Sequence, residues 1–79
     1  MAALTLYYRE GCHLCEDFFA QLDELINGQP HTLTLVDVDS HPDLCRDFGN
    51  KVPVLIGTHG ELCHYELDRQ SLLSYLSTG

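Results

Sequence analysis

Two cysteines separated by two residues carry the clearest chemistry in this chain of 79 residues. The segment Cys12-His13-Leu14-Cys15 follows an alternating apolar run and Gly11, and it precedes apolar residues at helical spacing. The first sulfur is therefore predicted at the start of a helix and the second one turn later on the same side, so that a disulfide can close between them. The unpaired N–H groups of a helix start also stabilise a thiolate. We interpret Cys12 as the nucleophile of a redox dithiol and Cys15 as the thiol that resolves the mixed disulfide.

Other interpretations of this pair stay open. The two thiols can hold zinc or an iron–sulfur cluster, from one chain or from two, which makes metal carriage the alternative function. The two cysteines can also be small apolar residues that only pack and have no chemical role. A zinc ribbon needs a second close pair of ligands, whereas Cys45 and Cys63 are isolated in the sequence. We therefore expect Cys45 and Cys63 to pack in the interior, and we predict no metal ligands.

Charge and composition exclude several classes of partner. Twelve acidic and four basic side chains give a formal net charge of -8, which repels nucleic acid and anionic membranes. The sequence contains no apolar run long enough to span a bilayer, and its first residues lack the basic and apolar regions of an export signal. We therefore expect a cytoplasmic monomer, in a reducing compartment where cysteines are more often catalytic than permanently bridged.

Hydrophobic periodicity predicts an α/β protein that forms one domain over residues 1–79. Strands are predicted at about 3–8, 31–38, 52–56 and 61–66, and helices at 12–26, at about 41–48 and after Asp68. The order is β-α-β-α-β-β-α. The helical crossovers imply that the first three strands are parallel in pairs or flank one another, and the hairpin at Thr58-His59-Gly60 adds an antiparallel edge. This predicts a four-stranded mixed sheet flanked by helices.

Capping residues and apolar faces refine this prediction. Ser40 is the expected N-cap of the second helix, with Pro42 in its first turn, and Asp68 is the expected N-cap of the third. One face of the first helix carries the apolar residues Leu14, Cys15, Phe18, Phe19, Leu22, Leu25 and Ile26.

Three segments together resemble a glutaredoxin, within the thioredoxin-fold superfamily. They are Cys12–Cys15 after the first strand, Val36–Asp39 at the end of the second strand, and Lys51-Val52-Pro53 before the third. The compact length and the Cys-His-Leu-Cys spelling are similar to a group of small bacterial glutaredoxin-like proteins. The resemblance covers nearly the whole chain. It implies a thiol–disulfide oxidoreductase that reduces protein disulfides or glutathione-mixed disulfides, with no resident cofactor and with glutathione as a candidate co-substrate.

The resemblance also implies roles for residues around the pair. Pro53 would be a cis-proline that faces the disulfide, and the main chain of Val52 would pair with the substrate like an added strand. Arg9 matches a position where glutaredoxins often carry a basic residue that helps to hold glutathione. In the inferred fold Arg9 and Lys51 both flank the site, which would make it locally cationic.

Some positions depart from the usual glutaredoxin pattern. His13 and Leu14 stand where proline and an aromatic residue are usual, and Lys51 stands where threonine is common. His64 and Tyr65 occupy the place of two glycines. His13, His64 and Tyr65 are therefore included among the predicted substrate contacts.

Overall fold

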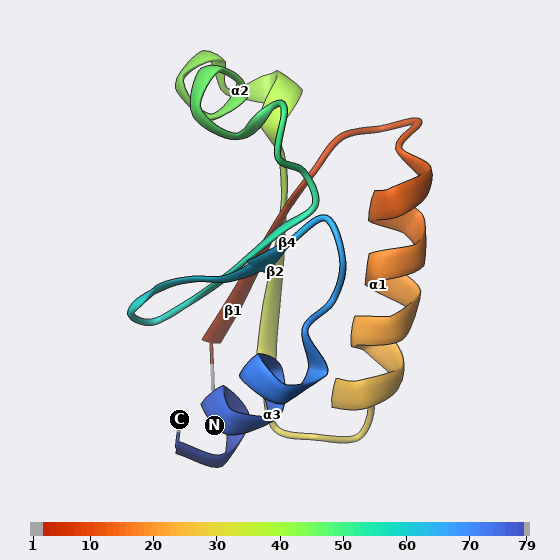
Figure 1. Cartoon of the computed structure of the whole chain (residues 1–79), viewed down its shortest axis with the longest axis vertical. Coiled ribbons are helices and arrows are strands. Elements are labelled where there is room, and N and C mark those ends of the chain that lie inside the picture. The colour runs from red at the N-terminus through yellow and green to blue at the C-terminus, as the bar shows by residue number, and fades with distance from the viewer. Residues whose placement is uncertain (1–2, 79) are drawn as a thin grey trace.

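The computed structural model describes residues 3–78 (Figure 1). Its first two elements form where the sequence alternates apolar and polar residues near the N-terminus and then changes to helical spacing. Strand β1 (Ala3–Tyr8) buries Leu4 and Leu6 and leads into helix α1 (His13–Ile26). The remaining elements are β2 (Thr32–Asp37), the short 3-10 helix η1 (Val38–Ser40), α2 (Pro42–Phe48), β3 (Val54–Gly57), β4 (Gly60–His64) and α3 (Arg69–Thr78).

The four strands form one mixed sheet in the order β2-β1-β3-β4, so β2 and β4 are its edges. Leu6 of β1 pairs in parallel with Leu35 of β2 and in antiparallel with Leu55 of β3. Leu55 in turn pairs with Cys63 of β4, next to an irregularity in the register. The predicted element order and the mixed four-stranded sheet are confirmed.

Strand β3 flanks β1, as expected, and the two strands are antiparallel. The reason is the length of α2. A helix of seven residues spans about 10 Å, which is shorter than the six-residue strand β2. The chain therefore does not return to the start of the sheet, and β3 begins at the end where β2 stops. Figure 1 shows α2 at this end of the sheet, where α1 also begins, and α3 at the opposite end.

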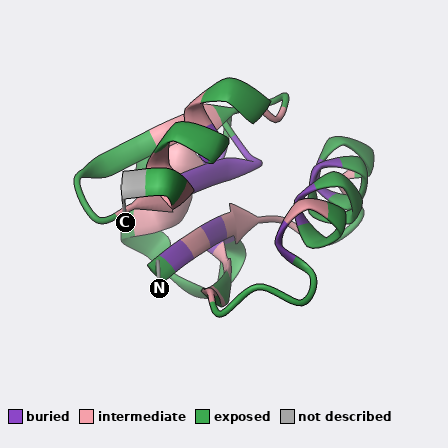
Figure 2. Ribbon diagram, turned by 90° about the horizontal axis from the view of Figure 1, so that it is seen from below, coloured by how far each residue is buried: buried purple, intermediate pink, exposed green. Residues whose placement is uncertain are grey.

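The main core lies between one face of the sheet and helices α1 and α3. Its buried members are Leu4, Leu6, Phe18, Leu22, Ile26, Leu55 and Leu72. Figure 2 shows buried residues along β1 and on the inner side of α1. On the opposite face of β1, Tyr7 packs against Phe48 of α2, with ring centroids 5.0 Å apart.

The apolar face of α1 is narrower than its sequence predicts. Leu14 is 50% exposed and Phe19 is 38% exposed, whereas Cys15, Phe18, Leu22 and Ile26 are buried. Leu14 and Phe19 each directly neighbour a buried position in the sequence, and adjacent residues point about 100° apart around a helix. A four-stranded sheet covers only a narrow stripe of α1, so these two side chains stay partly in solvent.

One predicted cap is correct and the other is wrong. Asp68 caps α3, because its Oδ1 accepts a hydrogen bond from the Ser71 main-chain N–H at 3.1 Å. Helix α2 instead begins at Pro42 and is preceded by His41, so Ser40 is not its cap. The carboxylate of Asp37 accepts the Asp39 N–H at 2.9 Å and starts η1, and Ser40 is the last residue of that turn.

Candidate dithiol site

Cys12 and Cys15 lie at the junction of β1 and α1. Gly11 takes a φ of +76°, a conformation that costs glycine little, and it turns the chain into the helix. Cys12 is the N-cap of α1, and its Sγ accepts a hydrogen bond from the main-chain N–H of Cys15 at 3.1 Å. Both cysteines are free thiols in the structure. The predicted position of the pair at a helix start is therefore what the structure shows.

The two thiols have different surroundings. Cys12 is partly exposed, whereas Cys15 is 4% exposed and packs with Val38 and Val52. Burial, followed by the contact with the Cys12 thiol, raises the pKa of Cys15 to about 11. The Cys15 thiol therefore stays protonated at neutral pH, while the sulfur of Cys12 faces a main-chain donor that stabilises negative charge.

The loop between α2 and β3 brings Val52 to this pair, and Pro53 follows it. The Val52–Pro53 peptide bond is cis, and both residues are buried. Cys12 packs against the small cluster that Cys15, Val38 and Val52 form. The Val52 N–H donates to the Phe48 carbonyl at 3.1 Å. This N–H already has a partner within the chain, so an added strand would have to use the Val52 carbonyl or replace that bond.

Tyr65 fastens this loop to the end of β4. Its main-chain N–H donates to the Pro53 carbonyl at 2.9 Å, and its hydroxyl donates to the Asn50 carbonyl at 2.7 Å. Tyr65 has a φ of +65°, which is strained for a residue with a side chain and persists only where surrounding contacts enforce it. The neighbouring His64 packs edge to face on the Tyr65 ring and lies 2.7 Å from a Glu61 carboxylate oxygen.

Arg9 contacts α2 and its preceding turn. Its guanidinium lies 3.0 Å from the Asp39 carboxylate and donates to the Cys45 sulfur at 3.4 Å. Asp39 thus balances much of the positive charge that Arg9 would bring to the site, although the guanidinium still acts on the Cys15 thiol and opposes the rise in its pKa. Lys51 is exposed and has no salt-bridge partner among residues 3–78. The sequence did not indicate the Arg9–Asp39 pair.

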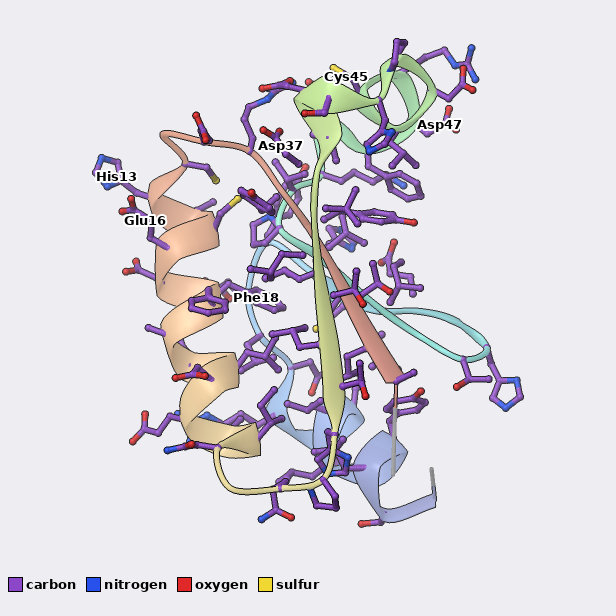
Figure 3. All side chains as sticks on the ribbon, turned by 180° about the vertical axis from the view of Figure 1, so that it is seen from behind. His13, Glu16, Phe18, Asp37, Cys45 and Asp47 are labelled. Carbon is purple, nitrogen blue, oxygen red and sulfur yellow. The ribbon has the colours of Figure 1, made fainter. Side chains whose placement is uncertain are left out.

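The remaining predicted residues lie further from the two sulfurs or in unexpected surroundings. Figure 3 shows His13 pointing away from the sheet. Its side chain is 96% exposed. Cys45 was expected in the interior. This is wrong, because it is only half-buried and lies beside Arg9 and Asp39. Cys63 does pack against the main core, and burial raises the pKa of its thiol.

Within residues 3–78, no group of three or more His, Cys, Asp or Glu side chains is placed to hold a metal ion. In the same part of the chain, no helix has the length and hydrophobicity needed to cross a bilayer.

Comparison with known families decides the classification. The family described as "Glutaredoxin-like domain (DUF836)" matches residues 3–77. The chain belongs to this family. No curated protein matches the glutaredoxin-like chain.

Solved structures agree with this classification. The solution NMR structure of protein Ne2328 from Nitrosomonas europaea is 38% identical, with a TM-score of 0.81, and the match covers 94% of the glutaredoxin-like chain and 89% of the other. The X-ray structure of the structural genomics target XcR50 from X. campestris is 31% identical, with a TM-score of 0.72 and coverage of 96% and 97%. A malarial protein at 19% identity, with a TM-score of 0.68 and coverage of 99% and 96%, shares the fold. The predicted glutaredoxin-like fold is thereby confirmed.

Proposed function

We propose that this glutaredoxin-like domain is a thiol–disulfide oxidoreductase that reduces protein disulfides or glutathione-mixed disulfides through Cys12 and Cys15. One observation carries the proposal. The sulfur of the partly exposed Cys12 accepts a main-chain hydrogen bond, and the thiol next to it is buried, which raises its pKa. An attacking thiol and a resolving thiol need these two different surroundings.

The reaction begins with Cys12. Its thiolate attacks one sulfur of the substrate disulfide, a mixed disulfide forms, and the other substrate sulfur leaves as a thiolate. Cys15 then gives up its proton and attacks the Cys12 sulfur. The second substrate thiol departs, and the Cys12–Cys15 disulfide remains. Two electrons pass from the dithiol to the substrate, and a low-molecular-weight thiol such as glutathione, used twice, restores the dithiol.

The location and assembly state follow from the same proposal. A dithiol that donates electrons works in a compartment where its own disulfide is reduced again, so we place the domain in the cytoplasm. The net charge of -8 disfavours close contact between two copies, which supports a monomer.

The proposal is tested with two cysteine variants and two substrates, a glutathionylated protein and a protein with an exposed disulfide. Cys12→Ser should abolish turnover of both. Cys15→Ser should stop turnover of the protein disulfide and accumulate a mixed disulfide, visible by intact mass, while free glutathione still resolves the glutathione adduct. Cys63→Ser is the control, because this thiol packs against the core away from the pair. Full activity of the Cys12→Ser variant contradicts the proposal.

A further inference from the structure

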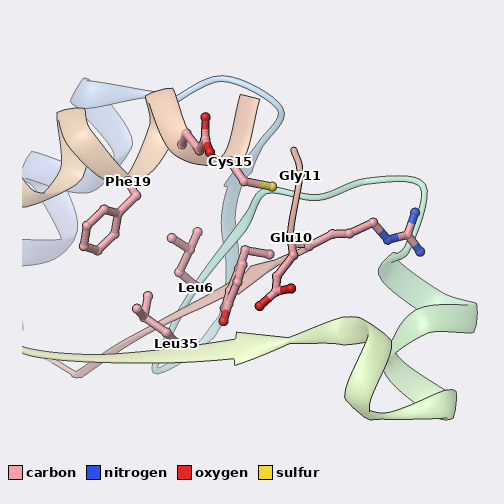
Figure 4. Close-up of a pocket in the computed structure, with 9 residues that line it drawn as sticks. Leu6, Glu10, Gly11, Cys15, Phe19 and Leu35 are labelled. Atoms are coloured by element: carbon pink, nitrogen blue, oxygen red, sulfur yellow. The ribbon is translucent and has the colours of Figure 1, made fainter. Parts of the chain in front are cut away.

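A cavity of about 320 Å³ lies between α1 and the strands β1 and β2, with Cys15 in its lining. Figure 4 shows Phe19 of α1 on one side, Leu35 of β2 on the other, Leu6 between them, and the Cys15 sulfur at the end nearer Gly11. Its volume is at the lower end of the range for ligand pockets and suits one large side chain. Val52 and Pro53 are not among its lining residues.

The apolar walls of this cavity are partly open to solvent. Phe19 is 38% exposed and Leu35 is 49% exposed, and the pairing of β1 with β2 holds Leu35 directly beside the buried Leu6. Single exposed apolar residues are common on protein surfaces. Here two of them line one cavity that also contains a thiol of the redox pair, which is an arrangement suited to binding an apolar group.

The charge around the cavity is negative. Glu10 and Glu16 are part of its lining, and both are exposed. Arg9 also lines it, but Asp39 balances that charge at 3.0 Å. Within residues 3–78, Glu10 has no salt-bridge partner, and Glu16 has only His13 at 3.8 Å. Two carboxylates at the mouth repel an anionic ligand and attract a cationic one.

We propose that this cavity is a specificity subsite for protein substrates: it takes an apolar side chain from a segment that also carries a lysine or arginine. The inference rests on the proposed function and names its substrate class. Gly11 lines the cavity and directly precedes Cys12, whose sulfur accepts the mixed disulfide. A substrate cysteine joined to Cys12 therefore places residues a few positions away at the cavity. The favoured substrates are disulfides in basic, apolar segments of proteins.

The test uses four short peptides, each with one cysteine in a mixed disulfide with 2-mercaptoethanol. They differ only in two residues near that cysteine: Leu-Lys, Leu-Glu, Ser-Lys or Ser-Glu. Reduction of bis(2-hydroxyethyl) disulfide, which is small and uncharged, measures the dithiol chemistry without the cavity. For the unaltered protein we expect kcat/KM to be about tenfold higher with leucine than with serine, and about two- to fivefold higher with lysine than with glutamate.

Two pairs of variants separate the apolar and the electrostatic contributions. Leu35→Ser should remove most of the preference for leucine, whereas Leu73→Ser, which changes an equally exposed leucine on α3, should keep it. Glu10→Lys should remove the preference for lysine, because the new charge offsets that of Glu16, whereas Glu24→Lys, at an exposed position further along α1, should keep it. Each preference is a ratio within one variant, so an effect on Cys12 itself cancels.

The outcomes are distinguishable. Equal kcat/KM for the four peptides, or the same response to Leu35→Ser and Leu73→Ser, overturns the subsite, and continued reduction of the small disulfide leaves the proposed function standing. Failure to reduce the small disulfide overturns the proposed function, and the subsite with it.

Discussion

The sulfur of Cys12 lies 3.1 Å from the main-chain nitrogen of Cys15, so the residue that carries the second thiol also supplies the donor that faces the first. This contact depends on Cys12 being the N-cap of α1, where the first N–H groups of the helix have no partner within it. The two thiols, one helical turn apart, therefore have different surroundings.

The two thiols should react with iodoacetamide at different rates. The pKa of Cys15 is raised to about 11, first by burial, so only about 0.1% of this thiol is ionised at pH 8. We expect Cys12 to be alkylated first throughout pH 7–9, and Cys15 to react appreciably only as the pH approaches 11. Fragment masses from a protein carrying Cys45→Ser and Cys63→Ser identify the modified residue. Equal rates for Cys12 and Cys15 at pH 8 contradict this assignment.

Tyr65→Phe should weaken the binding of protein disulfides. The variant keeps the ring and loses the hydroxyl that donates to the Asn50 carbonyl at 2.7 Å, so the loop that carries Val52 and Pro53 is held less firmly. A hydrogen bond of this kind contributes about 1 kcal/mol, which predicts a KM several-fold higher. The alkylation rate of Cys12 should not change. An unaltered KM shows that the Tyr65 hydroxyl does not position the loop for substrate.

Tyr75→Phe is the matched control, because it removes a hydroxyl far from the two thiols. The Tyr75 hydroxyl donates to the Ala3 carbonyl at 2.7 Å and lies 3.0 Å from the Thr58 main-chain nitrogen. Its loss should cost about 1–3 kcal/mol of unfolding free energy and leave KM unchanged.

Gly57→Ala should also lower the melting temperature, since a Cβ at residue 57 would lie 2.9 Å from the Tyr75 ring. Thermal unfolding and steady-state kinetics check both results.

Asp68→Asn should change how stability depends on pH. Hydrogen bonds from Ser71, first from its main-chain N–H, lower the pKa of Asp68 below the ordinary 3.8. The carboxylate thus contributes stability that is fully present above 3.8 and is lost as the pH falls through the lowered value. Asparagine still caps the helix but carries no charge. The melting temperature of the unaltered protein should exceed that of the variant at pH 7, and the gap should close toward pH 2. A gap independent of pH would rule out this contribution.

Local sequence patterns predicted most of the fold and the position of the thiols. Gly11 and the change of period after Cys12 are signals within a few residues, and they place the pair at a helix start. The cap at Asp68 and the hairpin between β3 and β4 are likewise set by neighbouring residues. Each depends on main-chain geometry that nearby side chains determine.

Contacts between distant residues were beyond the same reasoning. Arg9 and Asp39 are 30 residues apart, and Arg9 and Cys45 are 36 apart, so nothing local pairs them. The positive φ of Tyr65 is imposed by its bonds to Pro53 and Asn50, since the residue type itself disfavours it. The width of the buried stripe on α1 depends on how many strands face the helix, so spacing alone assigned Phe19 to the apolar face but did not show that it stays partly in solvent.

Among the strands that the structure describes, β2 has a neighbour on one side only, and its outer side presents main-chain donors and acceptors with which another polypeptide could pair. From Thr32 to Val36 this strand contains no lysine, arginine, proline or acidic residue that would disfavour pairing with another strand. Mutual repulsion by the net charge of -8 is then the main protection against edge-to-edge aggregation. Near pH 4.7, where that repulsion vanishes, colloidal stability should be lowest, and the chain should tend to precipitate without unfolding.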